Sequence, residues 1–539
     1  MHDHRHVDLR AIAWNAMEKY GFEPEFPRTV IQEVAGLDPA AVANRGDGIM
    51  DLRPLLWSSI DNDDTLDFDQ LEYCERGPDD EIYVRVAIAD VDAYVKKDSA
   101  TDRHAAFNGT SVYTGVETFP MLPDKLSKNI SSLVPGHDRW AVVIEYAVLP
   151  DGSVRGGDIY QAVVRNRAKL VYEEIGAWLE DAGAIPQALR EIPGLDEQVR
   201  MQHAAAQRLR KLRMEQGALD LDTIEARAVM EDGSVKELVV QRENAARHLI
   251  EEFMVAANGV MVNRLGESGV PMIQRVVRIP RYWDRIVQTA APYGERLPAE
   301  PDAKALAEFL ARRKEADPET FPDLSLTVVK LLGPGEYMML DPGAEPVGHF
   351  SLAVTDYTHA TAPNRRYVDI VNQRLLKSIL AKAEVPYSRR ELADLSEWLT
   401  DRDKSANKVE RFMRKAAAAV LLHDRIGESF EAIVTGASEK GTYVRLFEPP
   451  AEGRVVLGER GLAVGQKLAV RLKKTDPYNG HIDFERLGGR VAIRSFGRSR
   501  SQEVRQRTSR PSAPAKTTAR QPRGRYRHDG KSSRRPHGR

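Results

Sequence analysis

The chain has 539 residues, 42% of them hydrophobic, so it can bury a substantial core, and this length suggests about three or four domains. Its charged first residues, MHDHRHVDLRAIAW, contain no long apolar stretch, which argues against a signal peptide and a membrane anchor. Cys74 is the only cysteine, which excludes an internal disulfide and a cysteine zinc cluster. We therefore expect a cytoplasmic protein in a reducing compartment, with a monomer as the default state.

The first 49 residues are predicted to form a small helical cap. AIAWNAMEKYGF reads as one helix, and EPEFPRTVIQEVAGL reads as a second, proline-started helix. We find no internal repeat in the chain.

Carboxylates crowd into the next segment, IDNDDTLDFDQLEY, which spans residues 60 to 73. Its acidic side chains are Asp61, Asp63, Asp64, Asp67, Asp69 and Glu72. Because so many carboxylates repel one another, the segment favours a bound cation or a dense set of hydrogen-bond donors. A strand pattern, IYVRVAIADV, follows it at residues 82 to 91.

Three interpretations of the acidic segment compete. Counted from Asp61, oxygen-bearing side chains occupy the positions of a helix-loop-helix calcium site, but Leu66 stands where that loop needs glycine. A solvated acidic loop without a ligand is the second interpretation. The third is a magnesium site for phosphoryl chemistry, in which carboxylates hold the ion against a substrate phosphate.

The third interpretation gains support from a resemblance that covers roughly residues 50 to 415. Aspartates at relative positions 0, 3, 6 and 8 resemble the acidic signature of the ribonuclease II (RNB) exoribonucleases. Further blocks resemble that family in the family's own order, namely IADVDAYV, FPMLPDKLS, AKLVYEEI, GALDLD, ENAARHLIEEFMVAAN and DYTHATAPNRRYVDIVNQRLL.

The resemblance implies an α/β (α+β) catalytic domain over residues 50–385, with a helical end over 386–427. It implies processive hydrolysis of single-stranded RNA from the 3′ end to nucleoside 5′-monophosphates. Magnesium, or manganese in its place, would be held by Asp61 and Asp69, with help from Asp67 or Gln70. Arg365 matches the family arginine that neutralises charge on the phosphoryl oxygens, so it joins the three aspartates as a catalytic residue.

Four residues of the resembling blocks are candidates for RNA contact. Tyr113 matches an aromatic residue that stacks on the 3′-terminal base, and Glu410 matches a glutamate near the RNA end. Tyr172 either contacts the strand or fills the core. Arg366 either binds a phosphate or pairs with a buried acid.

The chain also departs from the family pattern. Gln70 stands directly after Asp69, the third candidate metal ligand, where the family usually has a further aspartate. Asn364 replaces an apolar residue of the arginine block, and Gln373 stands where histidine is common. A catalytically weak or inactive RNA-binding or regulatory protein is therefore the main rival hypothesis. A DNA-processing phosphodiesterase is a more distant one.

The C-terminal part begins with a helix-forming stretch at 391–424, followed by five short alternating strands between 429 and 486. These strands predict an OB-fold RNA-binding barrel over 428–487, in which Tyr443 either stacks on a base or joins the core. From Arg494 onward, fifteen Lys and Arg residues face only Glu503 and Asp529. The segment 488–539 is therefore predicted to be a disordered basic tail that binds RNA, with a solubilising role as the alternative.

Overall fold

The computed structural model describes residues 7–38, 48–222, 225–231, 234–438 and 441–488. The predicted basic tail lies outside the described residues, apart from Gly488. Both expected N-terminal helices are present, as α1 (Leu9–Lys19) and α2 (Arg28–Ala35). Pro27 caps α2, so the second helix is shorter than the sequence pattern suggested.

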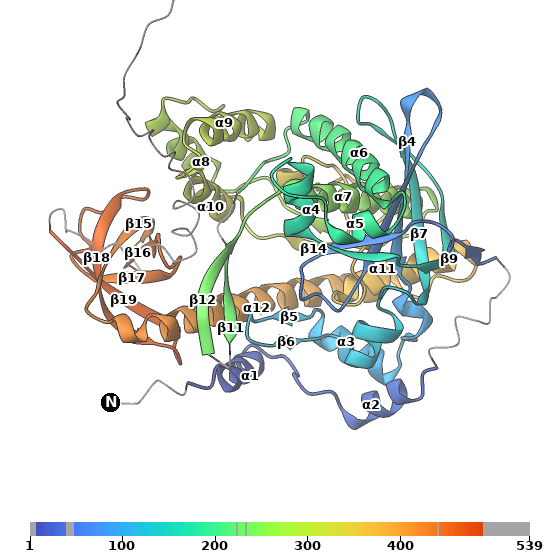
Figure 1. The fold of residues 1–539 in the computed structure, drawn as a ribbon, viewed down its shortest axis with the longest axis horizontal. Coiled ribbons are helices and arrows are strands. Elements are labelled where there is room, and N and C mark those ends of the chain that lie inside the picture. Colours follow the sequence, from blue (N-terminus) through green and yellow to red (C-terminus); the bar gives the residue numbers. More distant parts are fainter. Residues whose placement is uncertain (1–6, 39–47, 223–224, 232–233, 439–440, 489–539) are drawn as a thin grey trace, which may run out of the picture. The chain divides into compact units, whose positions relative to one another are not determined.

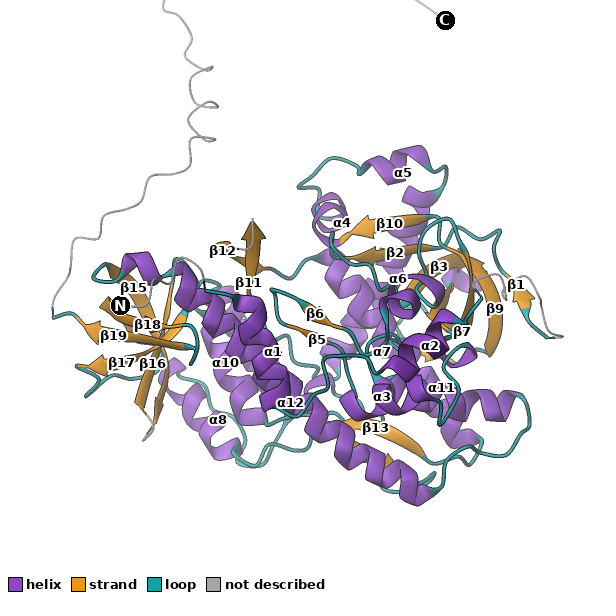
Figure 2. Ribbon diagram, turned by 90° about the horizontal axis from the view of Figure 1, so that it is seen from below, coloured by secondary structure: helices purple, strands orange, loops and turns teal. Residues whose placement is uncertain are grey.

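A mixed sheet of eight strands forms the centre of the catalytic region (Figure 1, Figure 2). Along the sheet the order is β1-β9-β7-β4-β3-β2-β10, and β8 pairs with β7. Only the β1–β9 and β2–β10 pairs are parallel. The strands are β1 (Met50–Asp51), β2 (Ser58–Asp61), β3 (Gln70–Arg76), β4 (Ile82–Ala89), β7 (Asp138–Val148), β8 (Val154–Arg155), β9 (Ile159–Arg165) and β10 (Ala168–Val171).

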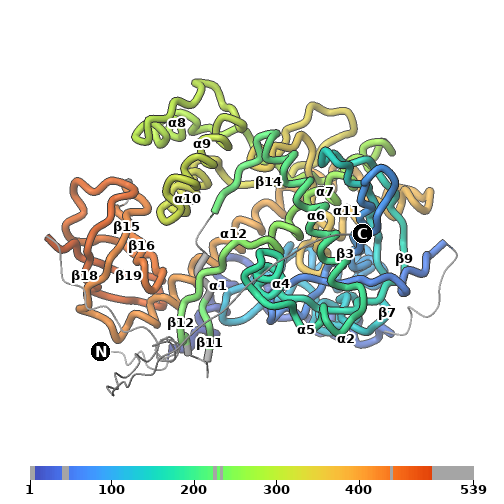
Figure 3. The backbone as a smooth tube through the Cα atoms, turned by 45° about the horizontal axis from the view of Figure 1, so that its top comes forward, coloured from blue at the N-terminus to red at the C-terminus, as the bar shows by residue number. Residues whose placement is uncertain are grey.

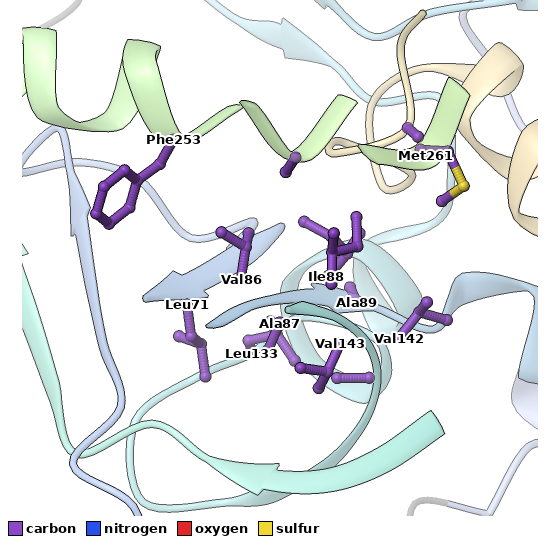
Figure 4. Close-up of a cluster of buried hydrophobic side chains, with 14 of the residues drawn as sticks. Leu71, Val86, Ala87, Ile88, Ala89, Leu133, Val142, Val143, Phe253 and Met261 are labelled. Carbon is purple, nitrogen blue, oxygen red and sulfur yellow. The ribbon is translucent and has the colours of Figure 1, made fainter. Parts of the chain in front are cut away.

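Helices cover the sheet and complete its core. They are α4 (Tyr172–Leu179), α5 (Gln187–Glu191), α6 (Leu195–Glu215) and α7 (Ala245–Glu267). Figure 4 shows Phe253 and Met261 of α7 above Val86 and Ile88 of β4. All four side chains are fully or almost fully buried, and burying a side chain of this size contributes about 1.5–3 kcal/mol. This packing fixes the strands whose ends carry the acidic residues.

Further helices and strands complete the region that precedes the barrel in the sequence. They include α3 (Ala100–Asn108), β5 (Val112–Tyr113), β6 (Thr118–Phe119), β11 (Glu225–Glu231), β12 (Ser234–Gln241), β13 (Met272–Val276), α8 (Trp283–Ala290), α9 (Ala303–Ala316), α10 (Phe321–Leu332), β14 (Glu336–Leu340) and α11 (Tyr367–Leu380). The longest helix is α12 (Arg389–Leu421), which begins with a capping box between Ser388 and Glu391. The β11–β12 hairpin lies against α12 (Figure 1, Figure 3).

The C-terminal strands close into the five-stranded barrel that the sequence predicted. They are β15 (Ser429–Ser438), β16 (Gly441–Leu446), β17 (Glu452–Leu457), β18 (Lys467–Asp476) and β19 (His481–Arg486), in the order β15-β16-β17-β19-β18. Arg445 of β16 contacts the buried Asp323 of α10 at 2.8 Å, which joins the barrel to the helical region before it. Among the described residues, no helix combines the length and apolar character needed to cross a membrane.

Candidate active site

The three candidate aspartates lie between the end of β2 and the start of β3. Asp61 is the last residue of β2, Asp67 lies in the connecting loop, and Asp69 directly precedes β3. Because β2 and β3 are antiparallel neighbours in the sheet, their connection returns Asp69 toward Asp61. We call residues 62–69 the acidic loop.

Asp69 joins the acidic loop to the arginine block, 295 positions away in the sequence. One carboxylate oxygen accepts a hydrogen bond of 2.8 Å from the Asn364 amide, and the other accepts one of 3.2 Å from Arg365 Nε. Asp69 is 3% exposed, whereas the Arg365 side chain is 45% exposed. The guanidinium therefore touches the acid and still presents much of its surface to a ligand.

The backbone of Arg365 also holds the hairpin that carries Tyr113. The Arg365 carbonyl oxygen accepts hydrogen bonds from the Ser111 amide (2.9 Å) and the Thr110 hydroxyl (3.0 Å). Ser111 directly precedes the two residues of β5, the second of which is Tyr113. The arginine block, the acidic loop and the Tyr113 hairpin thus form one connected unit.

The electrostatics of the aspartates suit a bound cation. Burial, together with the nearby Asp67, raises the pKa of Asp61 to about 6. Burial likewise raises the pKa of Asp69 to about 7, although Arg365 opposes this shift. In addition, Oδ2 of Asp61 is buried without a hydrogen-bond partner. A cation would favour the charged form of both carboxylates and would give Oδ2 of Asp61 the partner that it lacks.

The protein side chains alone do not enclose a metal ion. Among the residues that the structure describes, no three Asp, Glu, His or Cys side chains are grouped closely enough to hold one. Magnesium is commonly held by only one or two carboxylates, with water and substrate phosphate completing its shell. The residues therefore fit a magnesium ion that binds together with a phosphate substrate.

Tyr113 stands between the acidic loop and α12. Its hydroxyl donates a hydrogen bond of 2.8 Å to Oδ2 of Asp67, and its amide donates one of 3.1 Å to Oε1 of Glu410. The residue is 41% exposed. These three residues line a cavity of about 460 Å³, together with residues of the acidic loop, the β5–β6 hairpin and the β11–β12 hairpin. Two positions in this wall, Lys128 and Arg414, are basic.

The other predicted RNA contacts have protein partners in this structure. Arg366 donates two hydrogen bonds, of 2.8 and 2.9 Å, to the buried Asp369, which is the pairing that the sequence left open. The Arg247 guanidinium lies 4.4 Å from the centre of the Tyr172 ring. Lys415 lies 5.6 Å from the ring of Tyr443, which is not among the residues lining the cavity.

Two departures from the family pattern have structural roles. The Asn364 side chain is fully buried, and its Oδ1 accepts a hydrogen bond of 2.7 Å from the Ser131 hydroxyl. Gln373 donates to the Ala89 carbonyl (3.0 Å) and accepts from the Asp92 amide (3.2 Å) at the end of β4. Both side-chain amides therefore hold segments of the chain next to the site in place. Gln70, the third departure, is 8% exposed at the start of β3.

Sequence reasoning missed several residues that hold the acidic loop in place. Lys169, Ser132 and Arg247 all contact its backbone or side chains. Lys169 belongs to the AKLVYEEI block, but nothing in that pattern indicates that its partners are backbone carbonyls. The contacts became visible only in the folded chain.

Family models match two parts of the chain. The RNB domain model covers residues 49–382, and the model of the RNase II-type exonuclease C-terminal S1 domain covers residues 428–487. These ranges contain the eight-stranded sheet with its acidic loop and the five-stranded barrel, respectively.

Individual proteins give the same result. The chain is 29% identical over 497 residues to ribonuclease R of Thermotoga maritima, covering 85% of this chain and 68% of that protein. It is 28% identical to ribonuclease R 1 of Lactococcus lactis, covering 86% of this chain but only 59% of that one. The chain thus spans roughly three-fifths to two-thirds of the length of these relatives.

Solved structures share the fold. Mycoplasma genitalium RNase R in complex with ribose-methylated single-stranded RNA has a TM-score of 0.80 and 21% identity, with 89% of this chain and 78% of that one covered. The yeast protein Ssd1, described as a pseudonuclease, has a TM-score of 0.65 and 15% identity, with 84% and 56% covered. Since the RNB model matches more than half of the residues and the acidic signature lies within that match, the chain belongs to the RNB domain family.

Proposed function

We propose that this protein is a 3′-5′ exoribonuclease that hydrolyses single-stranded RNA to nucleoside 5′-monophosphates. The observation that carries the proposal is the contact of Asp69 with both Asn364 and Arg365. It joins the acidic loop to an exposed arginine, and the same loop lines a cavity of about 460 Å³ together with Tyr113 and Glu410. The names of the relatives support the same substrate class.

The chemistry follows from these side chains. Asp61 and Asp69, helped by Asp67, would hold magnesium or manganese, which would polarise the scissile phosphate and acidify an attacking water. Arg365 offers a planar fork of donors to the phosphoryl oxygens, where negative charge develops. Its contact with Asp69 holds that fork beside the carboxylates.

Tyr113 and the cavity wall would bind the 3′-terminal nucleotide. A half-exposed aromatic ring stacks on any base, which suits a degrading enzyme without sequence preference. Glu410 fixes the position of Tyr113 through the backbone. Tyr172, Arg366 and Tyr443 remain proposed RNA contacts, and each would have to share or exchange its present protein partner. A monomer in the cytoplasm is likewise part of the proposal.

An inactive RNA-binding protein is the second candidate, and Gln70 is the observation that favours it. A neutral amide offers a carbonyl oxygen but no charge to a cation. The likeness to a pseudonuclease is a likeness of fold alone, so it does not decide between the two candidates. The retained cluster of Asp61, Asp67 and Asp69 favours the enzyme, because a binding protein has no chemical need for carboxylates that repel one another, and Oδ2 of Asp61 is buried without a partner.

One assay tests the proposal. The full chain is incubated with single-stranded RNA or single-stranded DNA of equal length, with magnesium or with EDTA, and the products are separated by size. We expect RNA shortening with magnesium and none with EDTA or with Asp69→Asn. Binding of RNA without shortening under any metal condition would favour the second candidate, and equal rates on DNA would contradict the RNA specificity.

A further inference from the structure

Lys169 contacts the acidic loop from the strand next to β2. It belongs to β10, which pairs in parallel with β2 and places Lys169 opposite Ser59. Its ammonium group donates hydrogen bonds to the carbonyl oxygens of Asp63 and Thr65, the second at 3.1 Å. The same group lies 5.6 Å from the centre of the Phe68 ring. The Lys169 ammonium group thus contacts three residues of the loop.

Ser132 holds the second half of the acidic loop without any charge. Its hydroxyl accepts a hydrogen bond of 2.8 Å from the Phe68 amide and donates one of 3.0 Å to the Leu66 carbonyl. Ser132 is fully buried, so these bonds are shielded from water. Ser132 contacts the part of the loop next to the part that Lys169 contacts, but it does so with a neutral hydroxyl instead of a charged group.

The start of the acidic loop is held by a third set of donors. Nε2 of Gln241, at the end of β12, and a guanidinium nitrogen of Arg247, in α7, each lie 3.2 Å from Oδ1 of Asn62. The loop is therefore held through its backbone by Lys169 and Ser132, and through the Asn62 side chain by Gln241 and Arg247. Such ties are needed because the loop carries several carboxylates that repel one another.

We propose that Lys169 is a positioning residue for the metal site, because it fixes the loop that separates Asp61 from Asp67. This inference rests on the proposed function. Its ammonium group already donates hydrogen bonds to two backbone carbonyls. Its role is therefore to position the loop and not to bind an RNA phosphate. Residues that orient metal ligands in this way act on affinity although they never touch the ion.

The alternative is that Lys169 acts only through its positive charge. The two roles predict opposite changes in cation affinity when Lys169 is removed. A positive charge near Asp61 competes with a divalent cation, so removing it would tighten cation binding if the loop kept its place. If Lys169 positions the loop, its removal weakens cation binding. The charge-neutral Ser132→Ala change weakens binding only under the positioning role.

Manganese binding to the full chain without RNA is measured by electron paramagnetic resonance. Lys169→Met and Ser132→Ala are each expected to weaken the affinity about 10- to 100-fold, as is typical for residues that orient metal ligands. Lys169→Arg, which keeps a donor and a charge, should recover part of the loss. Lys128→Met is the matched control, since Lys128 lines the same cavity but pairs with Asp124 at 2.9 Å and makes no described bond to the loop. The manganese affinity of Lys128→Met should stay close to that of the wild type.

Hydrogen exchange of peptides covering residues 60–70 gives a readout that needs neither metal nor activity. Faster exchange in Lys169→Met and Ser132→Ala, with an unchanged rate in Lys128→Met, is the expected pattern. Tighter or unchanged manganese binding in Lys169→Met, or unchanged exchange in it, would overturn the positioning role. If Lys169→Met does not fold, Lys169→Arg and Ser132→Ala decide by the same two measurements. If the wild type binds no manganese, the proposed metal chemistry falls, and the exchange data alone decide the role of Lys169.

Discussion

The Tyr113 hydroxyl donates a 2.8 Å hydrogen bond to Asp67, so the proposed base-stacking residue is also bonded to a proposed metal ligand. Burial and the nearby Asp67 raise the pKa of Tyr113, so the phenol stays protonated and remains the donor in this bond. A cation that binds Asp67 has to compete with this hydroxyl. The structure therefore links the position of Tyr113 to the loading of the acidic site.

Two changes at Tyr113 separate its two contacts. Tyr113→Ala removes the ring, and RNA binding should weaken by about 1–3 kcal/mol, the usual contribution of one stacked base. Tyr113→Phe keeps the ring and loses only the hydroxyl, so RNA affinity should stay near wild type while half-maximal activity needs less magnesium. The measurements are RNA titrations and rates at several magnesium concentrations. Equal losses of RNA affinity in both variants would argue against stacking.

The neighbouring residues Arg365 and Arg366 should respond differently to substitution. Arg365→Lys keeps the charge but loses the fork, so turnover should fall about 100-fold with little change in stability. Arg366→Met leaves the buried Asp369 unpaired and should destabilise the fold by about 3 kcal/mol or more. Single-turnover rates and urea unfolding distinguish the two effects. An unstable Arg365→Lys protein would mean that this arginine is structural as well.

Asp69 and Gln70 test whether charge at the acidic site sets activity. Asp69→Asn should remove most turnover while RNA binding persists or tightens, because lost negative charge also reduces repulsion of the phosphate. Gln70→Asp should lower the magnesium concentration needed for the half-maximal rate. If the wild type is inactive and Gln70→Asp cleaves RNA, the chain is a binding protein built on a nuclease fold.

The pH dependence of stability should reveal two histidines held neutral beside the arginine block. Burial, with Arg275 nearby, lowers the pKa of His349 to about 4, and burial, with Arg366 nearby, lowers that of His359 well below its usual range. Between about pH 6.5 and pH 4 the unfolded chain therefore binds protons that the folded protein excludes, and stability falls as the pH drops through this window.

Removing His349 should flatten that dependence. Acidification from pH 7.5 to 5.5 should cost the wild type about 1 kcal/mol more than His349→Gln, after allowance for the partial exposure of this side chain. Urea midpoints at the two pH values check this. Parallel pH curves for the wild type and the variant would show that folding does not lower the pKa of His349.

Much of the fold could be predicted from local patterns. The alternation in residues 82–91 predicted β4, and five glycine-separated alternating segments predicted the closed barrel, because period-two burial is visible in a single sequence. The Asp69–Arg365 contact could not come from spacing, since 296 positions separate the partners. The family resemblance indicated that both residues serve one site, but it did not predict their contact.

Other features of the site leave no trace in a sequence. The bonds of Lys169 end on backbone carbonyls, which every residue carries, so no side-chain pattern marks them. Whether Arg366 binds phosphate or a buried acid also stayed open, because Asp369 is one of several acids within reach until α11 forms and places it one turn away.

The direction of RNA shortening tests the central claim most directly. A single-stranded RNA is labelled in one sample at its 5′ end and in another at its 3′ end, and both are incubated with the full chain and magnesium. A 3′-5′ exoribonuclease shortens the 5′-labelled strand stepwise and releases the 3′ label at once as a mononucleotide. Internal fragments, immediate release of the 5′ label as a mononucleotide, or two intact strands would contradict the account.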